Sequence, residues 1–458
     1  MDLHLNANRV RSGPSSARFR PRAAWLAAVA SVFAACAPAA GRGANPSAAS
    51  PPVTARPDPD SVLAASAHVS QRMYAAGGNT LTRTMALRAM DAEYEADPVH
   101  RQAVSLTMVR VAAELGAYRE ALAHADRLYG TELLPSPSSP VPVLDGFRPV
   151  DAAEYVARAA DTARVVMINE AHHVPQHRAF TRSLLATLHA KGFRYFAAEA
   201  LSESDTALNT RGYPIPRSGG YLAEPVFGDL VRTALQLGYR VVPYESRDPR
   251  ADRDLTQAGN LVRRILERDP AARVLVHAGW SHIDESGLLN GAPPMGTQFR
   301  RLAGIDPLTI DQTIMTERAS PAFEHPLYAA VVDRRGVARP TAFVGPDGRP
   351  WTLEPGKRDV TIFHPRSVYR GGRPTWLSAG EVRQRIRLAA EICGTAERCL
   401  VRARVESEAP NAIPMDQVEV VHGGPVPELV LPPGAYLIQV EDQAGNAVSS
   451  ARRVVRAR

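Results

Sequence analysis

Long hydrophobic runs are scarce in this chain of 458 residues. Its clearest apolar segment, residues 23–35, is too short to span a bilayer. No Gly-x-Ser-x-Gly motif occurs, so a serine nucleophile elbow has no support. The formal net charge is +7, but the basic residues are mostly scattered arginines without a stripe interleaved with aromatic residues. We therefore expect no nucleic acid among its partners.

The N-terminus predicts export. Five arginines between residues 9 and 22 precede the apolar segment, which ends in Phe33-Ala34-Ala35-Cys36. This pattern looks like a bacterial lipoprotein signal peptide over residues 1–36, with Cys36 lipidated and the membrane bound through its lipid. The alternative is an ordinary signal cut within residues 37–41. Both place the protein in the bacterial cell envelope, and the Ala, Pro, Ser and Gly of residues 37–60 predict a disordered tether.

Cysteine is rare, with three residues in the whole chain. The two that lie outside the signal, Cys393 and Cys399, are close together. In an exported protein such a pair predicts a structural disulfide, with two free thiols as the alternative. A metal site would need further ligands at matching spacing, and none lie nearby.

Residues 61–134 have helical periodicity and include one tetratricopeptide-like stretch at 115–122. A single copy cannot build a solenoid, so we expect a small N-terminal helical cap. A linker rich in Pro and Ser follows at 135–142.

Residues 148–378 predict an α/β domain with a mostly parallel sheet flanked by helices. The expected strands are 164–168, 193–198, 239–243 and 273–278, and the helices between and before them are 151–160, 176–190, 225–237 and 255–267. Hairpin turns are expected at 334–336 and 346–348. Residues 379–458 predict a helix at 381–392 and then an antiparallel β-sandwich that carries the disulfide and has a structural or docking role.

Ionisable residues follow each of the four predicted strands: Glu170, Glu199, Glu245, and His277 with His282. The first strand is followed by three more histidines at positions 172, 173 and 177. Because parallel strands end at one edge of a sheet, these groups should converge on a single cleft. Simpler interpretations exist: the histidines could be surface groups in a loop, His277 a core residue, Glu245 the partner of Arg247 or Arg250, and Trp280 a packing residue.

The order of motifs over residues 150–315 resembles the superfamily that joins erythromycin esterases, ChaN-type haem-binding lipoproteins and Tiki-type proteases. The matching segments are Asn169-Glu170-Ala171-His172-His173, Gly192–Glu199, Arg247-Asp248 with Asn260, Ala278–His282 and Pro294-Met295-Gly296. Asn169 stands where the family usually has Gly. The spacing of the esterases selects His173 and that of the other two branches selects His172, and both alternatives stay open.

The resemblance implies a hydrolase that cleaves an ester or amide of a small molecule or peptide with activated water. The expected catalytic residues are Glu170, His172, His173, Glu199 and His282, and the expected substrate-binding residues are Arg247, His177, Glu245 and Trp280. It also implies two possible cofactors. A divalent metal would use His172 and His282, and haem would need an axial ligand such as Tyr244 or His282. The alternative function is haem or metal binding without catalysis.

Overall fold

The structure, a computed structural model, describes residues 57–130, 144–248, 250–379 and 382–457. Cys36, the expected signal peptide, nearly all of the expected tether and the linker at 135–142 lie outside these ranges. The first described helix begins at Pro59, so the last two residues of the expected tether, 59 and 60, are helical. Within the described ranges, no helix is both long enough and apolar enough to cross a membrane.

Four helices lead the described chain: α2 (Pro59–Ala75), α3 (Thr80–Glu93), α4 (Pro98–Leu115) and α5 (Tyr118–Tyr129). The central α4 packs against the other three, and its second half is buried almost without interruption. Gly116, with φ of +83°, makes the sharp turn from α4 to α5, because glycine has no Cβ to clash in this left-handed conformation. Helices were expected over this segment.

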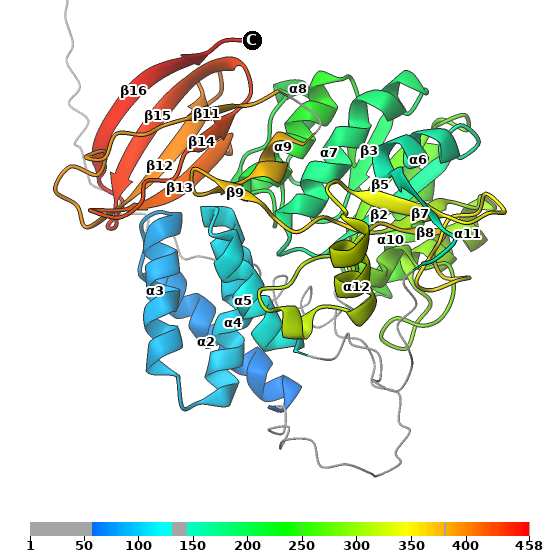
Figure 1. The fold of residues 1–458 in the computed structure, drawn as a ribbon, viewed down its shortest axis with the longest axis horizontal. Coiled ribbons are helices and arrows are strands. Elements are labelled where there is room, and N and C mark those ends of the chain that lie inside the picture. The colour runs from blue at the N-terminus through cyan, green and yellow to red at the C-terminus, as the bar shows by residue number, and fades with distance from the viewer. Residues whose placement is uncertain (1–56, 131–143, 249, 380–381, 458) are drawn as a thin grey trace, which may run out of the picture.

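A six-stranded parallel sheet forms the centre of the α/β region (Figure 1). Its strands are β2 (Val165–Glu170), β3 (Tyr195–Ala198), β4 (Arg240–Pro243), β5 (Val274–Gly279), β6 (Leu308–Asp311) and β8 (Val360–Thr361), in the order β4-β3-β5-β2-β6-β8. The parallel sheet is confirmed, with all four predicted strands in it. Strands β6 and β8 were not predicted, and the two residues of β8 are too few to show any periodicity.

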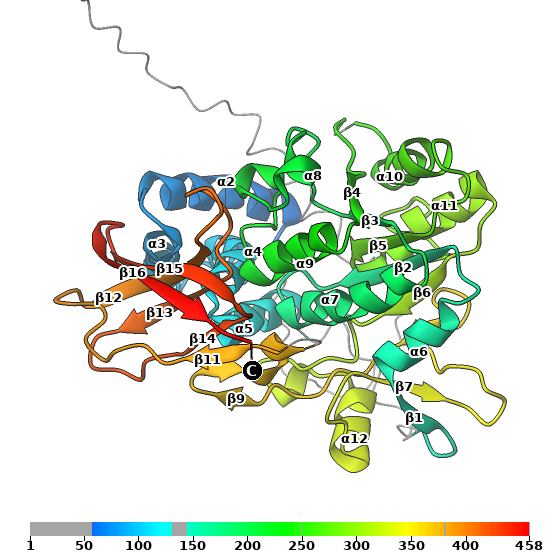
Figure 2. The same cartoon turned by 90° about the horizontal axis from the view of Figure 1, so that it is seen from above.

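Helices cover both faces of this sheet (Figure 2). On one face, Val166 and Ile168 of β2 pack with α6 (Ala152–Ala159), α7 (Pro175–Ala190) and α9 (Pro225–Gln236). On the other, Val165 and Met167 pack with α10 (Arg253–Leu261), its π-helical extension Val262–Leu266, and α11 (Met295–Ala303). Successive residues of a strand point to opposite faces, so burial on both sides explains the continuous apolar run.

The outer edge of β4 is blocked by a side chain of the short helix α8 (Leu208–Arg211). Asn209 donates to the Val241 carbonyl at 2.9 Å and accepts from the Val241 N–H at 2.8 Å. One amide side chain thus occupies the hydrogen-bonding groups that would otherwise be offered to another strand.

Two expectations for the later α/β region have different outcomes. Residues 334–336 do not form a hairpin: they end α12 (Pro326–Arg335), and Gly336 adopts the left-handed conformation that terminates a helix. The turn at 346–348 does follow β7 (Thr341–Val344), and a bridge from Val344 to Pro350 closes it. β7 pairs with β1 (Arg148–Asp151).

Other short elements are β9 (Tyr369–Arg370), β10 (Arg373–Pro374) and 3-10 turns at Pro216–Ser218, Trp280–Ile283, Pro321–Phe323 and Thr375–Ser378.

Antiparallel strands fill the C-terminal region. A four-stranded sheet, in the order β13-β12-β15-β16, contains β12 (Arg398–Val405), β13 (Asp416–Val421), β15 (Gly434–Asp442) and β16 (Ala447–Val455). A separate pair joins β11 (Gln384–Ile386) to β14 (Leu429–Leu431). The helix predicted at 381–392 is therefore wrong over its described part: Ile386 faces the core of these strands, and turns follow it.

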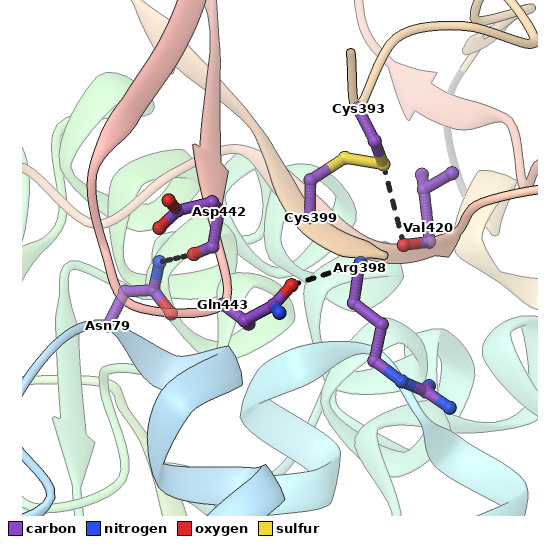
Figure 3. Close-up of a disulfide and its surroundings, with 7 residues drawn as sticks. All are labelled: Asn79, Cys393, Arg398, Cys399, Val420, Asp442 and Gln443. Atoms are coloured by element: carbon purple, nitrogen blue, oxygen red, sulfur yellow. Dashed lines mark hydrogen bonds between the residues drawn. A yellow bond between two sulfur atoms is a disulfide. The ribbon is translucent and has the colours of Figure 1, made fainter. Parts of the chain in front are cut away.

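The predicted disulfide between Cys393 and Cys399 is present. Figure 3 shows it joining the turns after β11 to the start of β12, beside the N-terminus of α3, where Asn79 donates to the Asp442 carbonyl at 3.3 Å. The first and last parts of the described chain therefore lie against each other.

Candidate functional site

The carboxyl ends of four neighbouring strands bring the expected site residues together. Glu170 is the last residue of β2, Glu199 follows β3, Glu245 follows β4, and β5 contributes His277 and ends at Gly279. They form two hydrogen-bonded clusters. We call them the Glu170 cluster (Glu170, His172, Arg178, His277 and Glu224) and the Arg253 cluster (Glu199, Glu245, Arg253, Asp254 and His282).

Glu170 is the centre of its cluster and is only 2% exposed. One oxygen, Oε1, accepts from Nδ1 of His172 and from Arg178, both at 2.8 Å. The other, Oε2, contacts Nε of Arg178 at 2.6 Å and Nε2 of His277 at 2.9 Å. Burial alone would raise the pKa of Glu170, but Arg178 and His277 hold that pKa well below its usual range. Glu170 is therefore an ionised, fully bonded carboxylate.

Arg178, in the second turn of α7, links Glu170 to a further carboxylate. Its Nη1 donates to Glu224 at 3.1 Å, and Glu224 also caps α9 by accepting from the N–H groups of Val226 and Phe227, both at 2.8 Å. Burial raises the pKa of Glu224 to about 7, although Arg178 and the two N–H groups oppose this shift. The sequence did not single out Arg178 or Glu224. The available signal for Arg178 was an arginine in the helix that follows a strand ending in Glu.

Arg253, the first residue of α10, is surrounded by three of the predicted site residues. It donates to Glu199 at 2.5 Å, to both oxygens of Glu245 at 2.8 and 3.0 Å, and to Nε2 of His282 at 2.8 Å. Burial opposes the charge of Arg253, but the two glutamates raise its pKa overall, so the guanidinium stays charged. Burial likewise raises the pKa of Glu199, yet the Arg253 guanidinium lowers it to about 2.

The bonds of His282 fix its tautomer. Because Arg253 can only donate, Nε2 of His282 must accept, and its Nδ1 therefore carries the hydrogen. That hydrogen is donated to Asp254 at 2.6 Å, and Asp254 also accepts from the N–H of Met295 at 2.7 Å. His282 is thus held as a neutral imidazole whose two nitrogens are both engaged.

The two clusters meet over Gly279. A Cβ at this position would lie 2.6 Å from Nε2 of His172 and 2.9 Å from Oε2 of Glu199, which accepts a hydrogen bond from the Gly279 N–H. Backbone strain is concentrated beside it. Trp280 and Ala200, which follow Gly279 and Glu199, have φ of +46° and +68°, values that residues with a side chain rarely adopt.

Aromatic rings surround the two candidate histidines differently. The ring of His172 stacks on Tyr221, with centroids 4.3 Å apart. His173 lies beside Tyr129 and Trp280 at 5.8 and 5.9 Å, and burial lowers its pKa to about 3. Trp280 also contacts Tyr129, and it packs against an apolar cluster of α5 and the β2–α7 loop. Of the two histidines, His172 is the one whose ring hydrogen-bonds to Glu170.

Two expected substrate-binding residues lie away from both clusters. Nδ1 of His177 accepts from the Ala171 N–H at 3.0 Å, and the residue is completely buried, so it supports the loop. Arg247 lies on the surface with 69% of its side chain exposed and pairs with Glu203. Arg253, six residues later, is the arginine that lies among the expected site residues Glu199, Glu245 and His282. The nearby Asn260 donates to the carbonyls of Tyr244 and Glu245, which holds the end of β4 in position.

The donor set does not fit the metal or haem that the resemblance implies. A metal on His282 would lie beside the Arg253 cation, and Nδ1 of His172 is already bonded to Glu170. As the structure stands, with Arg253 between Glu199, Glu245 and His282, no three His, Cys, Asp or Glu side chains of the described residues are close enough together to hold a metal ion. The hydroxyl of Tyr244 is fully buried and donates to the His277 carbonyl at 2.9 Å, so it cannot reach a haem iron.

Comparison with known proteins gives little beyond this geometry. No protein-family model and no curated protein matches the chain. One similar solved structure is that of the type III effector HopBA1, with TM-score 0.25 and 16% identity over 38% of this chain and 88% of that one. Another, described as bacterial protein toxins, has TM-score 0.27 and 14% identity over 48% of this chain. The chain spans 47% of that second structure. Similarity this low carries no argument, so membership in the esterase, ChaN and Tiki superfamily remains a prediction from the motifs.

Proposed function

We propose that the protein is a hydrolase that cleaves an ester or amide, and that His172, oriented by Glu170, is its general base. The observation that carries this proposal is the 2.8 Å contact between Nδ1 of His172 and the ionised Glu170. A carboxylate bonded to Nδ1 fixes the imidazole so that its Nε2 lone pair faces the reacting molecule.

In the proposed reaction, Nε2 of His172 takes a proton from water as the water oxygen bonds to the carbonyl carbon. The C=O π electrons move to oxygen and form a tetrahedral oxyanion. The oxyanion then collapses, the bond to the leaving oxygen or nitrogen breaks, and His172 returns the proton to that atom. Glu170 stays ionised and stabilises the imidazolium, as its lowered pKa requires.

The second cluster would position the site. Arg253 is a mostly buried cation that holds Glu199, and Glu199 is tied to the Gly279 N–H next to His172. Because Arg253 is already paired with two carboxylates, we propose that it orients Glu199 beside His172 and does not itself bind the oxyanion. His173 is less suited to proton transfer, because its pKa of about 3 leaves it a very weak base at neutral pH. We propose His173 and Trp280 as parts of the wall of the site.

We also propose where the protein is located and how its outer parts are arranged. Cys36 would be lipidated and hold the protein at the membrane of the cell envelope. The four N-terminal helices would act as a cap, with Tyr129 of α5 reaching His173 and Trp280. The C-terminal strands would form a small β-sandwich. No observation at these residues favours haem or metal binding without catalysis.

A screen of ester and amide substrates with purified full-length protein tests the reaction. With a hydrolysed substrate in hand, His172→Ala and Glu170→Gln should lower kcat by about 10²- to 10⁴-fold, as expected for loss of a general base or its orienting group. His173→Ala should keep more activity than His172→Ala, and His68→Ala, on exposed α2, serves as control. Full activity in both His172→Ala and Glu170→Gln would contradict the proposal.

A further inference from the structure

Arg253 holds the position that a metal ion would take in a site of this composition. Three side chains from three different segments point at it: Glu199 after β3, Glu245 after β4 and His282 after β5. Two carboxylates and one imidazole are a common ligand set for a divalent metal. Here each of them is bonded instead to one guanidinium, at 2.5 to 3.0 Å.

The surrounding structure fixes this arrangement. Asp254 orients His282 through Nδ1, as an outer carboxylate orients a metal-bound histidine, and Gln257 donates to Glu245 at 2.9 Å. Both Glu199 and His282 are almost fully buried, at 3% and 1% exposure. Without a cation at the centre, this buried group of carboxylates would be strongly unfavourable.

We infer that Arg253 is the resident cation of this site and takes the place of a metal, so that Glu199, Glu245 and His282 form a latent metal site which the wild-type protein keeps closed. A metal would have to displace a mostly buried, charged guanidinium to reach these ligands. Removing the guanidinium leaves an empty volume lined by these three ligand side chains. After small side-chain movements, a divalent ion can occupy that volume and neutralise the two carboxylates. The expectation that hydrolysis resists chelators rests on the proposed hydrolase, whereas the expected metal binding does not.

Binding of Co²⁺ and Zn²⁺ to the purified full-length protein tests the inference. Wild type should retain no stoichiometric Co²⁺ after dialysis, show no d–d absorption bands, and keep the same Tm with and without Zn²⁺. Arg253→Ala should have a lower Tm that Zn²⁺ raises again, and should bind Co²⁺ with d–d bands. Arg253→Lys keeps a cation and should bind no metal, and Arg253→Ala with His282→Gln should lose the bands.

Two results would overturn the inference. One is stoichiometric Co²⁺ in wild type that His282→Gln abolishes, since the metal would then coexist with Arg253. The other is an Arg253→Ala protein that neither binds Co²⁺ nor gains Tm from Zn²⁺; if that variant does not fold, Arg253→Gln replaces it in the same titration. Hydrolysis by wild type should resist chelators. If wild type hydrolyses nothing but Arg253→Ala binds Co²⁺, the proposed function fails and the latent site stands.

Discussion

Gly279 is the residue on which the geometry of both clusters depends. A methyl group there would lie 2.5 to 2.9 Å from His172 and Glu199, closer than real Cβ atoms approach their neighbours. Gly279→Ala should therefore push His172 away from its position and lower kcat by about 10²-fold, the usual effect of misplacing a reacting group by roughly 1 Å. Steady-state kinetics on a substrate from the screen would measure this. Gly220→Ala, where a Cβ meets nothing within 4 Å, is the matched control, and equal activity of the two variants would contradict the prediction.

Two buried histidines predict how stability depends on pH. Nε2 of His364 bonds to Gln312 at 2.9 Å, and its ring lies 5.0 Å from the ring of His177. Burial lowers the pKa of His364 to about 3 and that of His177 well below its usual value. In the unfolded chain both titrate near pH 6.5, so the unfolded state binds more protons between about pH 6.5 and 3. Their contribution to stability is complete above pH 6.5 and is lost as the pH falls.

Urea unfolding at several pH values would test this. Each buried neutral histidine adds a slope of about 1.4 kcal/mol per pH unit in that window. His364→Asn should reduce the slope by nearly one such amount, whereas His68→Asn, on the exposed face of α2, should leave it unchanged. A slope that His364→Asn does not alter would show that another group dominates.

At the site, the sequence predicted the residues that end strands and missed those that come from helices. Glu170 and Glu199 follow apolar runs, and the edge of a parallel sheet brings such residues together. Arg253 could not be told from Arg247 because the path of the loop after β4 decides which arginine turns inward. Arg178 was missed because eight residues along the chain separate it from Glu170, and only the angle of α7 brings the two side chains into contact.

The disulfide belongs to the scale of elements, because it ties a loop to a strand. Replacing Cys393 and Cys399 together by Ser should lower the free energy of unfolding by about 2 kcal/mol, the loop-closure value for so short a loop. Urea denaturation of the double variant would measure the loss, and wild type in reducing agent should lose a similar amount. Because the loop is distant from the two clusters, kcat should stay the same. A loss of activity at unchanged stability would contradict this.

Among the elements, strands that alternate with long helices were predictable, even the four-residue β3 and β4. The two-residue strand β8 was not. The helix expected at 381–392 failed because tertiary contacts override a weak helical pattern. Arg383 turns inward to pair with Asp229, and Arg385 bonds to the Arg370 carbonyl at 2.7 Å. No local signal indicates partners so far away in the sequence.

On the scale of the whole molecule, the C-terminal strands are tied to the α/β region by buried ion pairs. Arg232 of α9, about 1% exposed, bonds to both oxygens of Glu408 at 2.6 Å, and Arg373 bonds to Asp416 at 2.5 Å. Deleting residues 400–458 would remove the partners of both arginines and expose the surface that the C-terminal strands cover. Within the full chain, breaking one such buried pair costs about 3–5 kcal/mol.

We therefore expect the truncated protein to lose cooperative thermal unfolding, measured by circular dichroism, and to be cleaved rapidly in limited proteolysis. Glu408→Gln should destabilise the full chain by a few kcal/mol. Arg452→Ala, which removes the exposed pair with Glu406, should change the stability far less than Glu408→Gln. A truncated protein that melts as sharply as wild type would show that the α/β region folds alone.

The contact between the two ends of the described chain also constrains when folding can finish during synthesis. Arg88 of α3 pairs with Glu419 of β13, and Asn79 bonds to Glu441 of β15, across 331 and 362 residues of sequence. A ribosome releases these partners in order, so the first helices must wait for nearly the whole polypeptide before their docking surface exists. Translation thus extends the period in which the chain remains incompletely folded, which would suit the export that we propose for this protein.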